Sequence, residues 1–264
     1  MIENVVYGLN FRNKTDITGP DIYDETRPFL TTNKDNISLY CGVEFTQIAM
    51  NHMKSFPHKK FTLVTHNSDH SAEEIDLPNN LVHWYTQNLN FKNERVSALP
   101  IGFENPFWHP WKEHIINNAP CCDRIPKAFA QFNPVTYKEE RQLVLDLIND
   151  NKFTASVYNC LNGQNFEQYV YNMKKYTYCI CPRGNGIDTH RIWEALYFKC
   201  IPIVKKHITH EFDFDLPIIF IDDWNDLTDQ LIEEKHKEII DNGSINNFHS
   251  GPTRMEYWME KIFQ

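Results

Sequence analysis

The chain has 264 residues, of which 41% are hydrophobic and 23% charged, as in an ordinary globular enzyme with one large or two smaller domains. Its formal net charge of −9 argues against a nucleic-acid-coating protein, because such proteins bind phosphates through lysine and arginine. The seven cysteines form no CxxC motif, so we expect a reduced, cytoplasmic protein without a metal cluster. The sequence contains no run of about 20 apolar residues, so we expect no transmembrane segment.

Short strand patterns alternate with helical patterns along the whole chain. The expected strands are residues 36–41, 60–66, 81–84, 97–101, 127–132, 153–157, 176–181, 200–204 and 217–221. The expected helices are residues 44–55, 137–150, 165–175, 189–199, 224–241 and 252–262. This alternation predicts an α/β protein with parallel sheets and right-handed crossovers.

The segment APCCDRIP, residues 119–126, divides the pattern into two halves with its two prolines and its charge pair. We expect one Rossmann-like lobe over residues 1–122 and a second over residues 123–250. The final helix, within residues 251–264, is expected to pack back on the first lobe. Because ligands in such sheets bind beyond the carboxyl ends of the strands, the two lobes would face a common cleft.

The most informative segment is residues 176–204, YTYCICPRGNGIDTHRIWEALYFKCIPIV. An apolar strand is followed by the glycine-rich turn RGNG, in which glycine permits a positive φ and close backbone approach. Asp188 or Thr189 then caps a helix. Free N–H groups and the helix dipole favour an anion there, and the planar guanidinium of Arg183 suits a diphosphate. The alternative is a purely structural role, as a tight connection between a strand and a helix.

The helix itself carries a buried carboxylate that needs a partner. His190 and Glu194 lie one turn apart and share a face, while Glu194 sits between two apolar neighbours in the sequence. A buried carboxylate must be hydrogen-bonded or paired. The hydroxyls of a ribose would serve, and so would Arg191, three residues earlier; the spacing leaves both open.

The block CPRGNGIDTHRIWEAL, with the following CIPIV and PIIFIDDWNDL, resembles the C-terminal signature of the exostosin-like glycosyltransferases, including their small viral and microbial relatives. The upstream segments LVTHNSD, WYTQN, PIGFENPFW and QFNPVTYKEER occur in the family's order. The resemblance therefore covers about residues 61–227. One departure is Lys199, where the family usually has glycine before CIPIV.

This resemblance implies a GT-B fold and an enzyme that transfers a sugar, with inversion, from a UDP- or GDP-type donor to a glycan or glycoprotein acceptor. It implies no required cofactor; a divalent metal is compatible with it but not expected. By position, Arg183 would contact the diphosphate and Glu194 the ribose. The residues expected to bind the donor or shape its pocket are Arg183, Gly184, Asn185, Gly186, Asp188, His190, Arg191 and Glu194.

Inverting transfer also needs a base for the acceptor hydroxyl. Asp69 follows the strand at 60–66 directly and is the leading candidate, with Glu44 and Glu104 as rivals. Each of them can also be explained as a turn or capping residue.

The aromatic residues Phe103, Phe107, Trp108 and Trp111 follow the strand that ends at Ile101. They suit either stacking on an acceptor sugar or packing in the core or between the lobes.

Two other functions remain compatible with the same scaffold. A catalytically silent carbohydrate- or nucleotide-binding protein would keep the donor site without the base. A nucleotide-sugar epimerase would turn over the donor with no acceptor. Donor turnover, with and without acceptors, separates the three.

Overall fold

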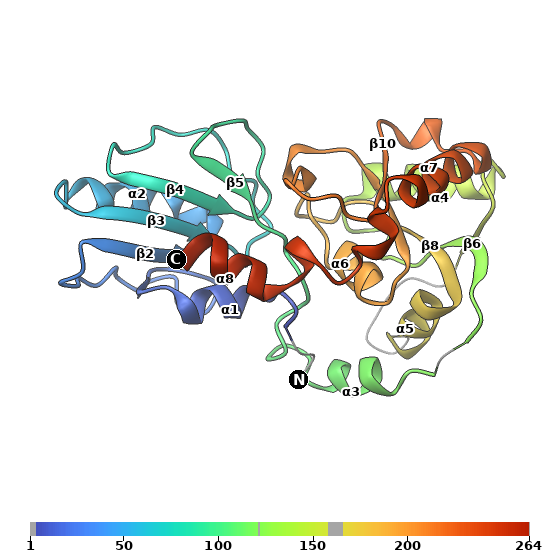
Figure 1. Ribbon diagram of the computed structural model, residues 1–264, viewed down its shortest axis with the longest axis horizontal. Helices are drawn as coiled ribbons and strands as arrows, with labels where there is room; N and C mark the ends of the chain where they lie inside the picture. Colours follow the sequence, from blue (N-terminus) through green and yellow to red (C-terminus); the bar gives the residue numbers. More distant parts are fainter. Residues whose placement is uncertain (1–3, 121, 158–165, 264) are drawn as a thin grey trace.

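The computed structural model describes residues 4–120, 122–157 and 166–263, so Cys121, Cys160 and the expected helix start at residue 165 lie outside the described residues. The structure is a mixed α/β arrangement with one five-stranded parallel sheet in each half of the chain, and helices flank both sheets (Figure 1). This architecture is compatible with two Rossmann-like lobes.

The first sheet has the strand order β1-β2-β3-β4-β5, in which every neighbour in space is also a neighbour in sequence. Its strands are β1 (Ile17–Thr18), β2 (Asn36–Cys41), β3 (Lys60–Thr65), β4 (Leu81–Thr86) and β5 (Val96–Ala98). Successive side chains of a strand point to opposite faces, so two separate clusters form. Helix α2 (Thr46–Lys54) covers one face, where Met50 packs in the same cluster as Leu63 and Trp84.

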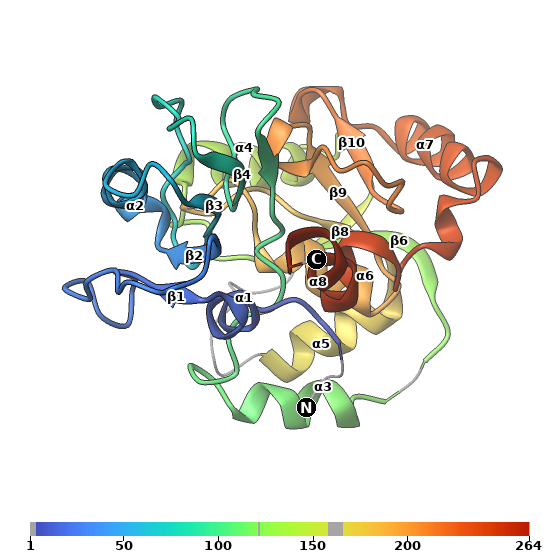
Figure 2. The same ribbon diagram turned by 60° about the vertical axis from the view of Figure 1, so that its left-hand side comes forward.

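Two helices from opposite ends of the sequence cover the other face of the first sheet. They are α1 (Gly8–Lys14) and α8 (Met255–Phe263), which lie side by side in Figures 1 and 2. Phe11 and Trp258 meet edge to face, with ring centroids 6.4 Å apart. Both are buried with Val64 of β3 in one cluster. The last helix thus packs on the first lobe, although it follows the second in sequence.

The second sheet has the order β10-β9-β8-β6-β7. Its strands are β6 (Ile125–Ala130), β7 (Ala155–Val157), β8 (Tyr176–Ile180), β9 (Ile201–Lys205) and β10 (Ile219–Ile221). Its helices are α4 (Lys138–Asn149), α5 (Phe166–Lys175), α6 (His190–Tyr197) and α7 (Asp229–Asp241), and α3 (Trp111–Asn118) packs against α5. The order reverses between β6 and β8, and the crevice beyond such a reversal is where open α/β sheets bind ligands.

All nine expected strands are present, but several element ends differ from the expected ones. The expected helix at 224–241 is a short turn, Trp224–Asp226, followed by α7, because the Thr228 hydroxyl caps α7 by accepting from the Leu231 N–H at 3.1 Å. Helix α6 stops early, since Lys199 has a left-handed backbone with φ 58°. No helix in the described parts of the chain combines the length and hydropathy that crossing a membrane requires.

Candidate functional site

A cavity of about 590 Å³ lies at the carboxyl ends of the first sheet's strands, against the start of α6. Glu44, Asp69 and Glu104 line it from the loops after β2, β3 and β5, and His190 lines it from the second lobe. The three candidate bases therefore share one cavity. Their meeting follows from the parallel sheet, which brings the carboxyl ends of its strands to one edge.

The three carboxylates differ in what surrounds them. Asp69 is exposed, and its Oδ2 accepts from the Asn185 side-chain amide at 3.2 Å, so the glycine turn of the second lobe reaches it. Glu44 is exposed. Glu104 is half-buried and accepts from Lys112 and, at 3.0 Å, from His109 Nδ1.

The surroundings of Glu104 make it a weak base. Burial raises the pKa of its carboxyl group, but the hydrogen bond and charge of Lys112, with the nearby histidines, outweigh burial and lower the pKa below its usual value. A carboxylate held ionised by an ammonium group has less tendency to take up a proton. Among the three carboxylates, Glu104 is thus suited to positioning rather than to proton transfer.

His190 was expected beside the donor, but the structure places it in the cavity of the first lobe. Its Nδ1 lies 2.7 Å from the carbonyl oxygen of Gly102. A carbonyl oxygen can only accept, so Nδ1 carries the proton and Nε2 is the basic atom of the neutral ring. A histidine oriented in this way has the chemistry of a general base. In the sequence nothing indicates that the first residue of this helix faces the other lobe.

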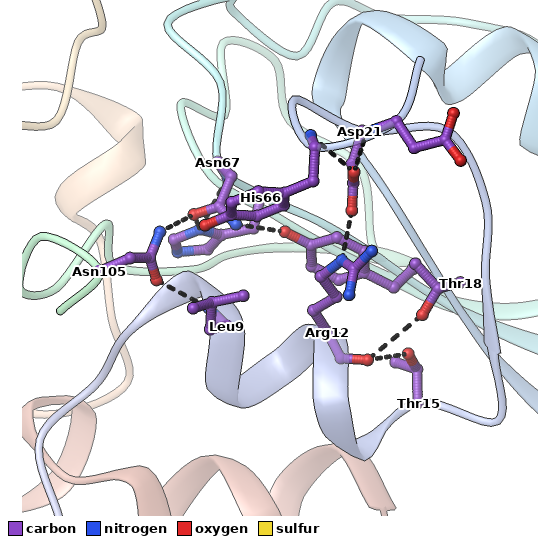
Figure 3. Close-up of polar contacts among 11 residues, drawn as sticks. Leu9, Arg12, Thr15, Thr18, Asp21, His66, Asn67 and Asn105 are labelled. Carbon is purple, nitrogen blue, oxygen red and sulfur yellow. Dashed lines mark hydrogen bonds and ion pairs between the residues drawn. The ribbon is translucent and has the colours of Figure 1, made fainter. Parts of the chain in front are cut away.

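A chain of amide hydrogen bonds runs through Asn67 and Asn105, two residues that line the cavity (Figure 3). The Asn67 side chain donates to the Tyr40 hydroxyl at 2.8 Å and accepts from the Asn105 amide at 2.9 Å. The Asn105 oxygen in turn accepts from the Leu9 backbone N–H at 2.9 Å, at the start of α1. Each amide thus uses both its donor and its acceptor, and the loops after β3 and β5 are held to α1.

His66 adjoins this chain of amides as a neutral residue. It is fully buried, its Nε2 donates to the Pro100 carbonyl at 2.9 Å, and its Nδ1 accepts from the Asn67 backbone N–H at 2.8 Å. Burial lowers the pKa of His66 to about 4. The ring therefore carries no charge near neutral pH and holds the backbone of Asn67 in place.

A second, smaller cavity of about 200 Å³ lies at the carboxyl ends of β8 and β9 in the second lobe. Arg183, Lys206 and His207 line it with Tyr137 and Glu140. The Arg183 guanidinium lies 4.1 Å above the Tyr137 ring, and it donates to the Asn185 carbonyl oxygen at 3.0 Å. These contacts hold a cation at the mouth of the turn, as an anion site requires.

Sequence reasoning placed Arg183 in this pocket but missed Lys206 and His207. Both follow β9 directly, which ends at Lys205, so the end of a predicted parallel strand was the signal that could have located them. His210 also lines the pocket. Its buried ring nitrogens make no hydrogen bond to any described residue, although Nε2 lies 3.5 Å from Asp188 Oδ1.

Glu194 has a partner that the sequence did not indicate. Its carboxylate is buried and accepts from the Tyr169 hydroxyl at 2.6 Å. Burial, followed by the charge of Glu194, raises the pKa of Tyr169 well above its usual value. Arg191 donates to the Gln131 carbonyl at 3.2 Å. Burial lowers the pKa of Arg191, but its acidic neighbours, Tyr169 and Glu194 among them, outweigh burial and raise it, so Arg191 and Glu194 also interact through their charges. Neither Glu194 nor Arg191 is among the described residues that line the two cavities.

Asp188 joins the lobes instead of opening into a pocket. Its fully buried carboxylate accepts from the Ile101 backbone N–H at 2.7 Å, from the Thr189 N–H at 2.8 Å and from the Trp193 indole at 2.9 Å. Its own backbone N–H donates to Asn88 Oδ1 at 2.9 Å. The start of α6 is thereby fixed to the first lobe.

The two glycines of the turn have one of the two roles expected of them. Neither Gly184 nor Gly186 has a positive φ, so the expectation of left-handed backbone there was wrong. Their role is close approach: a Cβ on Gly184 would lie 3.2 Å from Arg141 Nη2, and one on Gly186 would lie 2.8 Å from Asn88 Nδ2. Glycine at 186 thus lets the turn touch the other lobe.

Among the described residues, no three His, Cys, Asp or Glu side chains are grouped so that they could hold a metal ion. In comparisons with known proteins, no family model matches this chain, and no curated protein matches it significantly. Fold and site therefore define its class: a parallel α/β protein with an acidic cavity and a basic pocket on either side of one glycine turn.

Proposed function

We propose that this protein is a glycosyltransferase of GT-B architecture, which transfers a sugar from a nucleotide-diphosphate donor to a glycan acceptor with inversion. One observation carries the proposal. The glycine turn has the cationic pocket of Arg183 on one side, while its Asn185 touches Asp69 of the carboxylate-lined cavity on the other, at 3.2 Å. A donor diphosphate and an acceptor hydroxyl can then approach one sugar carbon from opposite sides.

The basic pocket suits the leaving diphosphate. As the bond between the sugar carbon and the diphosphate oxygen breaks, negative charge grows on that oxygen, and fixed cations stabilise it without reorganisation. Arg183 is oriented by the Tyr137 ring, and Lys206 and His207 add charge or hydrogen bonds beside it. The resemblance adds Glu194 as the ribose ligand; a ribose hydroxyl there would share the carboxylate with Tyr169.

The carboxylate-lined cavity suits the acceptor. A base takes the proton of the acceptor hydroxyl while its oxygen bonds to the sugar carbon on the face opposite the leaving diphosphate. Asp69 remains our leading base because it lies beside the glycine turn, and His190 Nε2 is the rival that the structure adds. Glu104, with its lowered pKa, would orient the acceptor by accepting a hydroxyl hydrogen bond.

The test is thermal stabilisation by UDP, GDP, CDP and their sugar conjugates, with and without Mg²⁺ or Mn²⁺. A ligand at 100 times its Kd stabilises a protein by about 2.7 kcal/mol, which gives a readily measured shift. Wild type should respond to one nucleotide family and Arg183→Ala should not. Lys237→Ala, which removes an exposed charge from α7, is the matched control and should respond as wild type does.

Turnover of the stabilising donor then separates the alternatives. A transferase releases nucleoside diphosphate faster when acceptor glycans are added. An epimerase converts the donor sugar without acceptor, and a silent binding protein converts nothing. If no nucleotide stabilises the protein, or if Arg183→Ala responds as wild type does, the proposal fails.

A further inference from the structure

Beside the carboxylate-lined cavity lies a cluster of three exposed apolar side chains and the half-buried Tyr23. We call Ile22, Tyr23, Phe107 and Trp108 the aromatic platform. Phe107 is 71% exposed, Trp108 48% and Ile22 40%. Phe103, which was grouped with them in sequence, is buried in the core of the second lobe. The expectation of core packing thus holds for Phe103 and not for Phe107 or Trp108.

The rings of the platform are packed on one another rather than scattered. Tyr23 and Trp108 are stacked, with centroids 6.0 Å apart and planes 16° apart. Phe107 meets Trp108 edge to face at 5.7 Å and Tyr23 at 6.5 Å. Exposed clusters of this kind in a soluble fold mark binding sites far more often than isolated apolar residues do.

The loop that carries Tyr23 is held in place by Asp21 and Arg12. Asp21 is fully buried, it accepts from Arg12 Nε at 2.5 Å (Figure 3), and its Oδ1 accepts from the Tyr23 backbone N–H at 2.9 Å. The Arg12 guanidinium also lies 5.3 Å from the centroid of the Tyr23 ring. The platform is therefore formed before any ligand binds, which lowers the entropic cost of binding.

The platform is continuous with the acceptor cavity, because Ile22 and Trp108 line that cavity together with Glu44, Asp69 and Glu104. We propose that the aromatic platform is a second carbohydrate subsite, which holds a more distant sugar of a neutral oligosaccharide acceptor. This inference rests on the proposed function for the identity of the cavity. It adds that the acceptor is a chain of at least two sugars.

The chemistry of the lining selects this class of ligand. A flat aromatic face fits the C–H face of a sugar ring, while carboxylates accept hydrogen bonds from hydroxyl groups at its edge. Lys112 compensates the charge of Glu104, but Glu44 and Asp69 form no ion pair with a described residue and leave the cavity lining negative, which disfavours a phosphorylated or acidic ligand. The same charge, with a net charge of −9, disfavours an anionic membrane surface.

The experiment measures binding of neutral trisaccharides (cellotriose, maltotriose and chitotriose) and of their monosaccharides by saturation-transfer NMR and calorimetry. Wild type should bind at least one trisaccharide about tenfold more tightly than its monosaccharide, and Trp108→Ala should lose that gain. Phe107→Ala, at a more exposed position, should weaken it in the same direction. Ile48→Ala, an exposed apolar residue on α2, should bind as wild type does.

Several outcomes would overturn the inference: no trisaccharide binds, monosaccharides bind equally well, or Trp108→Ala has no effect. Trp108-dependent sedimentation with phosphatidylcholine vesicles would overturn it in favour of a lipid surface. Nucleotide stabilisation, measured on the same variants, keeps the two proposals apart. If trisaccharides bind through Trp108 but no nucleotide does, the proposed transfer fails and the subsite stands; if nucleotides bind and trisaccharides do not, only the subsite fails.

Discussion

Replacing Asp188 tests whether its carboxylate joins the two lobes or contacts a nucleotide ligand. It is fully buried and accepts from the N–H groups of Ile101, Thr189 and Trp193. Asp188→Asn keeps the size of the side chain but replaces one accepting oxygen by an NH₂ group. That group would face an N–H donor, and at least one donor would lose its acceptor.

The magnitude follows from the buried donors. A hydrogen bond to a charged group contributes about 1.5–3 kcal/mol, and a buried donor without an acceptor costs about 1–3 kcal/mol. We expect Asp188→Asn to reduce the free energy of unfolding by about 3 kcal/mol. At about 2–4 °C per kcal/mol for a protein of this size, the Tm should fall by about 6–12 °C. Differential scanning fluorimetry and urea denaturation, followed by tryptophan fluorescence, measure both quantities.

The matched control is Asp215→Asn, which makes the same change at an exposed position before β10 and should leave the Tm unchanged. The resemblance assigned Asp188 to the donor pocket, and this alternative makes a different prediction. If Asp188→Asn keeps the Tm of wild type within about 1 °C but loses nucleotide stabilisation, Asp188 is a ligand contact and our interpretation of its role is refuted.

Three further predictions test the cavity and the fold. Burial lowers the pKa of His66 to about 4, so the unfolded chain takes up the proton first as the pH falls. The free energy of unfolding should be full above about pH 6.5 and decline by about 3 kcal/mol toward pH 4. Urea titrations should show this decline in wild type and a smaller one in His66→Gln. Lys199→Gly should raise stability by about 1 kcal/mol, because a left-handed backbone strains any residue with a Cβ; an unchanged or lower Tm would contradict this. Asp69→Asn and His190→Gln each remove one candidate base. The variant that removes the true base should lower the rate of sugar transfer by about 10²–10⁴-fold while donor binding stays intact. Equal, small losses of transfer rate in both variants would exclude both residues as bases.

Most of the fold could be predicted because its strands are short apolar runs with clear turn signals. The missed elements are those that tertiary contacts create. Helix α1 has only seven residues, GLNFRNK, with a glycine and two asparagines that are poor helix formers. It forms because Phe11 is fully buried against the first sheet and against Trp258 of the last helix. Strand β1 has two residues, which is too short for any pattern.

The candidate site was predictable to the extent that it follows the strands. Asp69 and Glu44 each come directly after a predicted parallel strand, so their meeting at one edge of the sheet could be expected. Contacts between elements distant in sequence could not be predicted. The bond from Tyr169 to Glu194 joins two helices, and the bond from His190 to Gly102 joins two lobes; neither helical spacing nor composition encodes such a pair.

The glycine turn shows how one sequence pattern can serve two physical purposes. A glycine-rich turn between a strand and a helix is usually interpreted as a phosphate loop. In this protein, Arg183 of the turn lines the basic pocket, while Gly186 gives the space in which Asn88 of the first lobe packs. Because Asp188, two residues later, is bonded to Ile101, the turn is fixed to both lobes at once. The close approach at Gly186 therefore helps to set the distance between the basic pocket and the carboxylate-lined cavity.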